Sequence, residues 1–293
     1  MVSKSGVYIS RVSNDLEMSV DRLLDDLEGS MELSEKKHIC IKPNICLLKK
    51  SNTGVTTDPK LVKSIIRFIQ KKTDAKISII ESDATINNLD LAYQALGWTE
   101  IADEFDVDLI NLTNEPRVSI KMEGYVLRDH KIPKILQTCD YLISVPKLKA
   151  HEMTGITGTL KNQFGCLPER NKSKYHKQIS QVIVDAVRMC PPDLSILDAI
   201  ISLKGGVVTG TPVRTNLIMA SFDPVAFDAA CAYLVGKNPK KIRHLRLAAK
   251  IGLGSANYEL RGDTSAFVQI MDGRRSLIDQ MTSLFLSISS RGA

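Results

Sequence analysis

The sequence predicts an α/β fold, a mostly parallel sheet with helices on both faces in the manner of a Rossmann-like layered sandwich. Short apolar runs rich in aliphatic residues indicate buried strands at residues 38–44, 76–83, 107–112, 140–147, 194–199 and 216–223. Apolar residues at helical spacing follow several of these runs, at residues 58–72, 89–98, 179–190 and 223–236. Strands that alternate with helices favour βαβ units, whose strands run in parallel.

Two of the predicted helices begin with the same Asp-Pro pair. Asp58 and Asp223 suit the capping position, and the proline after each suits the first helical position. Gly236 suits the end of the last of these helices, because glycine readily adopts the left-handed conformation that ends many helices. Further C-terminal helices are expected in residues 237–293, including an amphipathic one at 276–293.

The composition is globular and argues against several classes of protein. Hydrophobic residues make up 43%, the net charge is +6 and aromatic residues are 5%, so we do not expect a nucleic-acid binder with stacking side chains. The sequence contains no run of about 18 apolar residues, and no membrane span is predicted. Because we find no internal repeat and no low-complexity linker, residues 1–293 are predicted to form a single α/β domain.

The six cysteines do not form a local metal motif. No two of them stand in a CxxC pair, so the sequence contains neither a zinc knuckle nor a ferredoxin motif. The first residues lack the apolar segment of a secretory leader. We therefore expect reduced thiols in a cytoplasmic protein.

Charged and amide side chains follow the predicted strands at the point where each strand ends. In an open parallel sheet, ligands bind in the crevice at the carboxyl ends of the strands, where residues distant in sequence meet. Loops are polar in any case, so the same residues would also suit a solvated edge. The acids among them suit a divalent cation or the positioning of a lysine. The residues that we expect to bind a substrate at this edge are Lys42, Asn44, Asp83, Lys147, Lys149, Asp198 and Asp223.

Residues 147–177 concentrate positive charge. They contain seven basic and two acidic residues, an excess of +5 in a chain whose net charge is +6. Such a run can be a solvated face. Its lysines and Thr-Gly pairs also suit a phosphate or a carboxylate, although neither a Walker loop nor a GxGxxG pattern is present. We therefore predict Thr154, Thr157 and Asn162 as further substrate contacts.

Three residues of this segment are candidate catalytic groups. Lys161 would hold the charge of an anionic substrate. His151 and His176 suit proton transfer, because imidazole titrates near neutral pH. Each histidine would equally suit a structural, hydrogen-bonded role, which is the interpretation that we give to the other histidines of the chain.

Seven motifs together resemble the domain-of-unknown-function family 362. They occur in that family's order over roughly residues 38–236, and the Lys-Asn-x-Phe-Gly and Asp-Pro-Val-Ala-x-Asp elements are the most specific. The resemblance implies an α/β domain and no reaction. It also implies that many relatives carry a ferredoxin-like module with two four-iron clusters, which this chain lacks. The motifs are KPN (42–44), TTDP (56–59), VPKLKAH (145–151), TGITGTLKNQFG (154–165), the later His176, LDAI (197–200) and SFDPVAFDA (221–229).

Cys46 and Cys166 lie beside two of these motifs and leave three alternatives open. They could be small buried residues, ligands of an iron–sulfur cluster built across the fold, or a nucleophile with a histidine as its base. The cofactor is therefore unknown, and an iron–sulfur cluster is one candidate.

The leading hypothesis is an enzyme that binds a small anionic molecule at the strand ends. Since cluster-bearing relatives transfer electrons, we favour oxidoreductase chemistry linked to an iron–sulfur centre or to an electron-transfer partner. The alternative is a non-catalytic scaffold that holds a cluster, a metal or a metabolite for a partner. In that case the lysines would form a docking surface that is sensitive to salt.

Overall fold

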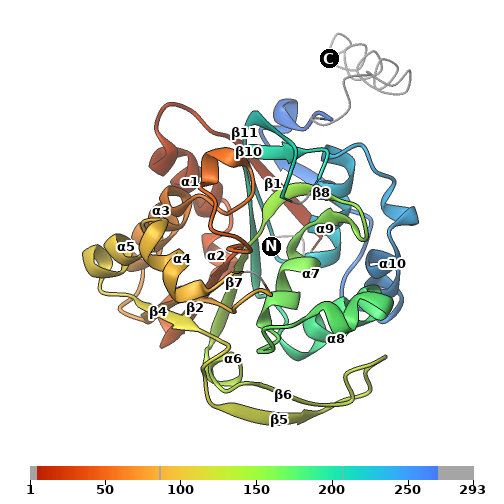
Figure 1. Cartoon of the computed structure of the whole chain (residues 1–293). Coiled ribbons are helices and arrows are strands. Elements are labelled where there is room, and N and C mark those ends of the chain that lie inside the picture. Colours follow the sequence, from red (N-terminus) through yellow and green to blue (C-terminus); the bar gives the residue numbers. More distant parts are fainter. Residues whose placement is uncertain (1–4, 86, 207, 270–293) are drawn as a thin grey trace.

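A mixed sheet of ten strands lies at the centre of the computed structural model, which describes residues 5–85, 87–206 and 208–269 (Figure 1). A separate hairpin consists of β5 (Arg117–Lys121) and β6 (Asp129–Pro133). The strands of the large sheet are β1 (Gly6–Arg11), β2 (His38–Pro43), β3 (Lys76–Glu81), β4 (Asp108–Asn111), β7 (Tyr141–Val145), β8 (Lys147–His151), β9 (Gly155–Thr157), β10 (Leu194–Lys204), β11 (Thr211–Ser221) and β12 (Glu259–Gly262). Eight of them follow the order β12-β1-β11-β10-β7-β2-β3-β4, and β8 pairs with β10 and with β9.

The six predicted strands are present as β2, β3, β4, β7, β10 and β11. The neighbours β10, β7, β2, β3 and β4 are all parallel, which confirms the mostly parallel sheet. β11 is the exception and runs antiparallel to β10, with Leu197 opposite Met219. The reason is that the chain returns directly from β10 to β11, whereas a parallel pair needs a crossover connection.

The helices confirm both predicted Asp-Pro starts. Asp58 accepts a hydrogen bond from the amide of Lys60, and Asp223 caps the second helix in the same way. The predicted helix at 89–98 ends at Ala95, and a second helix begins at Trp98, because Gly97 adopts a φ of +82° between them. The helices are α1 (Leu16–Asp25), α2 (Glu28–Met31), α3 (Pro59–Gln70), α4 (Leu89–Ala95), α5 (Trp98–Phe105), α6 (Ile135–Thr138), α7 (Thr159–Asn162), α8 (Ile179–Met189), α9 (Pro224–Leu234) and α10 (Arg243–Lys250). Short 3-10 turns are η1 (Leu33–Glu35), η2 (Ser51–Thr53), η3 (Gln163–Cys166), η4 (Ser173–Gln178), η5 (Pro239–Lys241) and η6 (Thr264–Ala266).

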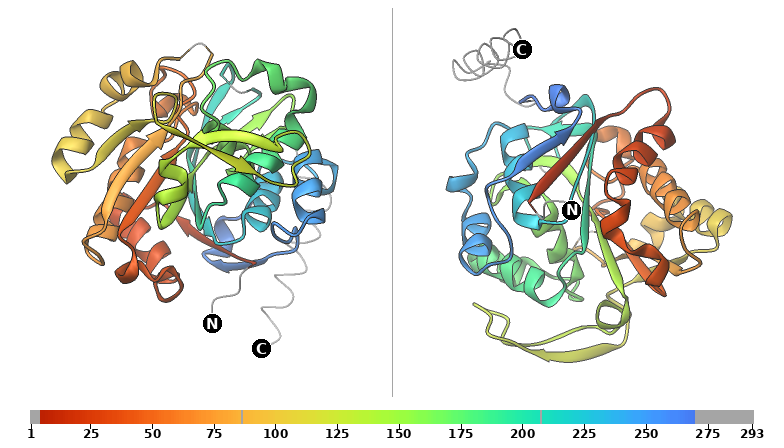
Figure 2. Two further views of the ribbon diagram at one scale, coloured as in Figure 1. Left: turned by 90° about the horizontal axis from the view of Figure 1, so that it is seen from below. Right: turned by 180° about the vertical axis from the view of Figure 1, so that it is seen from behind.

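The sheet separates two apolar cores. Helices α1, α3, α4 and α5 cover one face, and α8, α9 and α10 cover the other, as Figures 1 and 2 show. Within β2 the side chains alternate: Ile39 and Ile41 enter the first core, whereas Cys40 enters the second. This alternation follows from the period of two in a strand. Strands buried on both faces explain the continuous apolar runs that predicted them.

Some elements carry no strong signal in the sequence. β1 and β12 are such strands, and the β5–β6 hairpin is held to the body by Asp185, whose carboxylate accepts the amides of Tyr125, Val126 and Leu127. The predicted helix at 276–293 lies outside the described residues. The single-domain assignment stays a prediction. None of the described helices combines the length and apolar character needed to cross a membrane.

Candidate functional site

A small cavity lies at the point where the order of the parallel strands reverses. From β2 the chain continues to β3 and β4 on one side, whereas β7 and β10 lie on the other side of β2. The crevice at the carboxyl ends of two such strands is the usual ligand site of an open α/β sheet. Here a cavity of about 60 Å³ lies between the ends of β2 and β7 and is lined by Asn44, Cys46, Pro146, Lys147, Lys149, Thr157, Gly158, Lys161 and Asn162.

Thr57 holds the two strand ends together. Its hydroxyl donates to the carbonyl of Val145 at 2.8 Å and accepts the amide of Asn44 at 2.8 Å. The ends of β7 and β2 are therefore fixed to each other through the segment that leads into α3. The TTDP motif, which contains Thr57, thus contributes to the shape of the cavity.

Two of the predicted substrate-binding lysines are neutralised within the fold. The ammonium group of Lys42 lies 2.7 Å from a carboxylate oxygen of Glu81, and that of Lys147 lies 2.8 Å from Asp198. All four side chains are at most 6% exposed. A Cβ atom on Gly165 would lie 2.4 Å from Glu81, so the Lys-Asn-x-Phe-Gly motif needs its glycine to cover this ion pair.

Lys149 is buried, and none of the described carboxylates pairs with it. Its ammonium group donates to the side-chain oxygen of Asn44 at 2.9 Å and to the carbonyl of Val55 at 2.9 Å, and it lies 3.5 Å from the sulfur of Cys46. The two oxygen acceptors belong to neutral groups. They satisfy the hydrogen bonds of the ammonium group but bring no negative charge to offset it. The side chain is 1% exposed.

Lys161 contributes a second cation that no carboxylate offsets. It is half-buried, and its ammonium group lies 5.2 Å from the centre of the Phe164 ring. Within the described part of the chain it makes no ion pair and no hydrogen bond through that group. Burial, followed by the ammonium of Lys149, lowers the pKa of Lys161 to about 8. The site therefore holds an amine that titrates close to neutral pH.

The structure places His151 near this pair and His176 on the surface. The Nδ1 atom of His151 accepts the amides of Met153 and Thr154 at 3.2 and 3.4 Å, so its proton lies on Nε2. Burial and the charges of Lys161 and Lys149 lower the pKa of His151 to about 3. His151 is thus a neutral hydrogen-bond donor at pH 7. His176 is exposed on η4.

The amide and hydroxyl side chains that were predicted to contact a substrate mostly form hydrogen bonds within the protein. Asn162 donates to the carbonyl of Lys42 and to Ser144 at 3.1 and 3.0 Å, and its oxygen accepts from Lys42. Thr154 donates to the carbonyl of Ile156, and Thr157 lies 3.0 Å from the carbonyl oxygen of Lys149. These side chains shape the wall of the site more than they offer free hydrogen bonds.

The predicted acids do not gather around the cavity. Asp83 pairs with Arg170 at 2.9 Å, and Asp198 is used by Lys147. Asp223 caps α9 and also accepts the amide of Ser255, so its two oxygens are occupied. It follows β11, which runs antiparallel to β10. The end of β11 therefore lies beside the beginning of β10, at the end of the strands opposite to the site. The expectation that Asp223 joins the substrate site is therefore not met.

The two cysteines considered as metal ligands lie in different environments. Cys46 lines the cavity, whereas Cys166 is 1% exposed and belongs to the apolar core beneath α8. An iron–sulfur cluster normally needs four cysteine or histidine ligands. Among residues 5–85, 87–206 and 208–269, no three His, Cys, Asp or Glu side chains are grouped so that they could hold a metal ion. These residues therefore do not fit a cluster held by Cys46 and Cys166.

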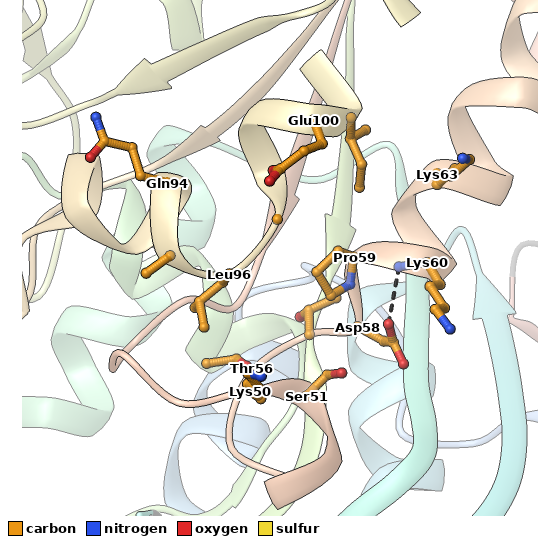
Figure 3. A pocket seen from close by; sticks show the side chains of 14 residues that line it. Lys50, Ser51, Thr56, Asp58, Pro59, Lys60, Lys63, Gln94, Leu96 and Glu100 are labelled. Carbon is orange, nitrogen blue, oxygen red and sulfur yellow. Dashed lines mark hydrogen bonds between the residues drawn. The ribbon is translucent and has the colours of Figure 1, made fainter. Parts of the chain in front are cut away.

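A larger cavity of about 500 Å³ lies between the start of α3 and the α4–α5 turn (Figure 3). None of its three lysines is a buried, unpaired cation: Lys63 pairs with Glu104 at 2.6 Å, and Lys50 and Lys60 are exposed. The larger volume favours this cavity as a ligand site, whereas the buried lysines without a carboxylate favour the smaller cavity as an anion site. The smaller cavity is therefore the candidate site, because a buried unpaired cation is costly unless a ligand meets it.

Two partnerships escape prediction from sequence. Glu81 neutralises Lys42 across neighbouring strands, and opposite charges at consecutive strand ends are the signal that could have revealed it. The second is a contact between Asp228 on α9 and His244 on α10, whose facing atoms lie 3.9 Å apart. Only the packing of α10 against α9 brings these two together.

Comparison with known proteins gives a family and little chemistry. The family profile described as domain of unknown function (DUF362) matches residues 39–233. A thylakoid-associated protein of Synechocystis is 25% identical over 252 residues, which cover 83% of this chain and 77% of the relative. The lactate racemase apoprotein of Thermoanaerobacterium thermosaccharolyticum aligns with a TM-score of 0.45 and 13% identity, over 79% of this chain. The chain spans 57% of that protein, and a likeness of this size carries no functional argument.

Proposed function

Since the chain belongs to the domain-of-unknown-function family 362, which is named for no reaction, we propose its function from the site itself. We propose an enzyme that binds the carboxylate or similar oxyanion group of a small molecule between Lys149 and Lys161. Lys161 then exchanges a proton with the bound molecule.

The observation that carries this proposal is the pair of cations without a carboxylate. Lys149 and Lys161 line one cavity, while the neighbouring Lys42 and Lys147 are each matched by an acid at 2.7–2.8 Å. Removing an ammonium group from water costs several kcal/mol unless an opposite charge offsets it. An anionic ligand would supply that charge, which supports a binding role for the unpaired lysines.

The size of the cavity limits what enters it. About 60 Å³ is far below the roughly 300–1,000 Å³ of a pocket that encloses a drug-sized ligand. One carboxylate, or an ion of similar size, fits this space. We therefore propose that the cavity holds the charged group of a substrate whose remainder lies outside it.

Lys161 is the proposed proton-transfer group. Without a bound anion, a pKa of about 8 leaves Lys161 neutral in roughly a tenth of the molecules at pH 7, about 300-fold more than for an ordinary lysine; a bound anion favours the protonated form, which is the form that can donate a proton. A positioned acid or base of this kind accelerates a reaction by about 10²–10⁴-fold. His151 does not line the cavity, so its neutral Nε2–H would meet only the part of the substrate that lies outside it.

The finer expectations from the sequence stay predictions. Oxidoreductase chemistry would need an electron carrier, and no group of His, Cys, Asp or Glu side chains among the described residues is arranged to hold a metal ion. A non-catalytic carrier of the same anion would bind without turnover, so loss of binding in a variant would not be accompanied by loss of a reaction. A cytoplasmic location likewise stays a prediction.

Acetate is the first probe, because it is small and carries a carboxylate. We expect acetate to raise the melting temperature of the wild-type protein in a saturable manner, since a ligand of the native state stabilises it. Lys149→Met and Lys161→Met should lose this shift. Lys63→Met, in the larger cavity, is the matched control and should keep it. Equal shifts in all four proteins would refute the assignment to the small cavity.

A further inference from the structure

The two lysines of the anion site differ in how their amino groups are held. The ammonium group of Lys149 has three N–H donors. Two of them meet the oxygens of Asn44 and Val55 at 2.9 Å, and the third meets the sulfur of Cys46 at 3.5 Å. Loss of a proton would break one of these hydrogen bonds, so Lys149 is held as a fixed cation. The sulfur is the weakest of the three acceptors, and a carboxylate oxygen of a ligand can replace it.

Lys161 has no such partners. Within the described part of the chain its amino group forms neither an ion pair nor a hydrogen bond, and it lies 5.2 Å from the centre of the Phe164 ring. This amine can therefore lose a proton without losing a hydrogen bond. Both lysines line the cavity, but Lys161 is the one whose nitrogen is free to react.

The two amines also lie at different depths. Lys149 is 1% exposed, whereas Lys161 is half-buried. Because both line the same small cavity, Lys149 lies at its closed end and Lys161 lies nearer its mouth. A small acid that enters with its carboxylate toward Lys149 would place its next carbon atom beside Lys161. In a 2-oxo acid that carbon atom is a ketone.

The position of Lys161 is fixed by its neighbours in and around α7. Asp228 on α9 accepts the amide of Thr159 at 2.6 Å, and a side chain at Gly158 would collide with the same carboxyl group. The side-chain amide of Asn162 donates to groups near the ends of β2 and β7 at 3.1 and 3.0 Å. The backbone on both sides of Lys161 is therefore held, and a positioned reactant needs such support.

The environment of this amine favours nucleophilic attack. A lysine is activated as a nucleophile when it is desolvated or when it lies next to another cation. Both conditions hold for Lys161, which is half-buried and shares its cavity with Lys149. Burial and the charge of Lys149 accordingly lower the pKa of Lys161.

We propose that Lys161 is a catalytic nucleophile that forms a Schiff base with the ketone of a small 2-oxo acid, while Lys149 holds the carboxylate of that acid. The inference rests on the function proposed above and deepens it, because the carboxylate binds in the same anion site. The neutral amine attacks the carbonyl carbon, a carbon–nitrogen double bond replaces the carbon–oxygen double bond, and the oxygen leaves as water. The proton that the ammonium group released returns to the nitrogen. The resulting iminium ion carries the same positive charge as the original ammonium group and offsets the carboxylate.

Hydride reduction tests the proposal, because it converts a Schiff base into a stable secondary amine. Wild-type protein treated with pyruvate and sodium cyanoborohydride should gain the mass of one pyruvic acid less one oxygen atom, and peptide mapping should place this adduct on Lys161. Lys161→Met should lose this adduct, whereas Lys63→Met, in the larger cavity, is the matched control and should be labelled as the wild type. Absence of an adduct from Lys161 in the wild type, or equal labelling of Lys161 and the exposed Lys50 and Lys60, would overturn the proposal.

Methyl pyruvate tests the role of the carboxylate, since this ester keeps the ketone and carries no charge. Each labelling rate is divided by that of N-acetyl-lysine, which removes the difference in intrinsic reactivity. Lys161 should react about 10–100-fold more slowly with the ester than with pyruvate, and Lys149→Met should slow labelling by pyruvate to a similar extent. Equal normalised rates for the acid and the ester would overturn the inference.

The acetate experiment distinguishes failure of this inference from failure of the anion site. Acetate should also slow the labelling of Lys161 by pyruvate, because both acids need Lys149. If acetate raises the melting temperature through Lys149 and Lys161 and pyruvate still forms no adduct, the anion site stands and the Schiff base is refuted. If acetate has no effect and Lys161 reacts equally with the acid and the ester, the anion site fails and the inference fails with it.

Discussion

Replacing Lys161 by methionine is expected to raise the free energy of unfolding at pH 7. The folded protein lowers the pKa of this lysine from 10.5 to about 8, chiefly by burial. Between these two values the unfolded chain binds more protons than the folded one, so stability rises as the pH rises through this window. Below about pH 8 both states are protonated, and the folded state bears the full cost of the half-buried charge.

The size of the effect follows from the shift. A change from 10.5 to about 8 corresponds to roughly 3 kcal/mol at 1.36 kcal/mol per pKa unit, an upper value because the side chain is partly exposed. We therefore expect Lys161→Met to gain about 1–3 kcal/mol at pH 7 and much less at pH 10. For a protein of this size each kcal/mol corresponds to about 2–4 °C in Tm.

Urea unfolding of the wild type and the variant at several pH values measures this difference. Comparison of the two proteins cancels the contribution of Lys172, whose pKa burial also lowers to about 8. The same substitution at Lys42 is the control with the opposite sign, because it leaves Glu81 buried and unpaired and should cost about 3–5 kcal/mol. A Lys161→Met protein that is destabilised at pH 7, or whose gain does not change with pH, would refute the reasoning.

Three further predictions follow from contacts around the site. Gly158→Ala should cost about 1–3 kcal/mol and weaken acetate binding, because its methyl group would meet Asp228, whereas Gly29→Ala, in open space, should be harmless in urea unfolding. His151→Gln should reduce the loss of stability on acidification from pH 7 to 4.5. The pKa of His151 is about 3 in the folded protein and 6.5 in the unfolded chain, so the wild type loses stability as the pH falls between these values. An unchanged profile of unfolding free energy against pH would count against a neutral His151. Iodoacetamide should label Cys46 more slowly when acetate is present than when it is absent. The half-buried Cys139, which does not line the cavity, should label at the same rate with and without acetate, as measured by mass spectrometry. Equal protection of both cysteines would remove Cys46 from the site.

The sequence predicts the architecture well because its signals are local. Apolar runs specify strands buried on both faces, and the Asp-Pro pairs at Asp58 and Asp223 specify helix starts that the structure confirms. The prediction missed strands with weak signals, such as β1 and β12, and it misplaced the end of the helix at 89–98, where Gly97 with positive φ precedes the next helix. The motifs that resemble the family are likewise local, and the match to residues 39–233 confirms them.

What the sequence by itself determined is the α/β class, the family and the gathering of lysines at the carboxyl ends of parallel strands. Only the tertiary structure decided which lysines are available, because charge is offset by partners far away in the chain. Lys42 is paired with Glu81 and Lys147 with Asp198, while Lys149 and Lys161 have no carboxylate partner among the described residues. The direction of β11 removed Asp223 from the site, and the packing of α10 against α9 brought Asp228 and His244 together. Local patterns specify which group a residue carries; the energy of that group depends on neighbours that only the folded chain supplies.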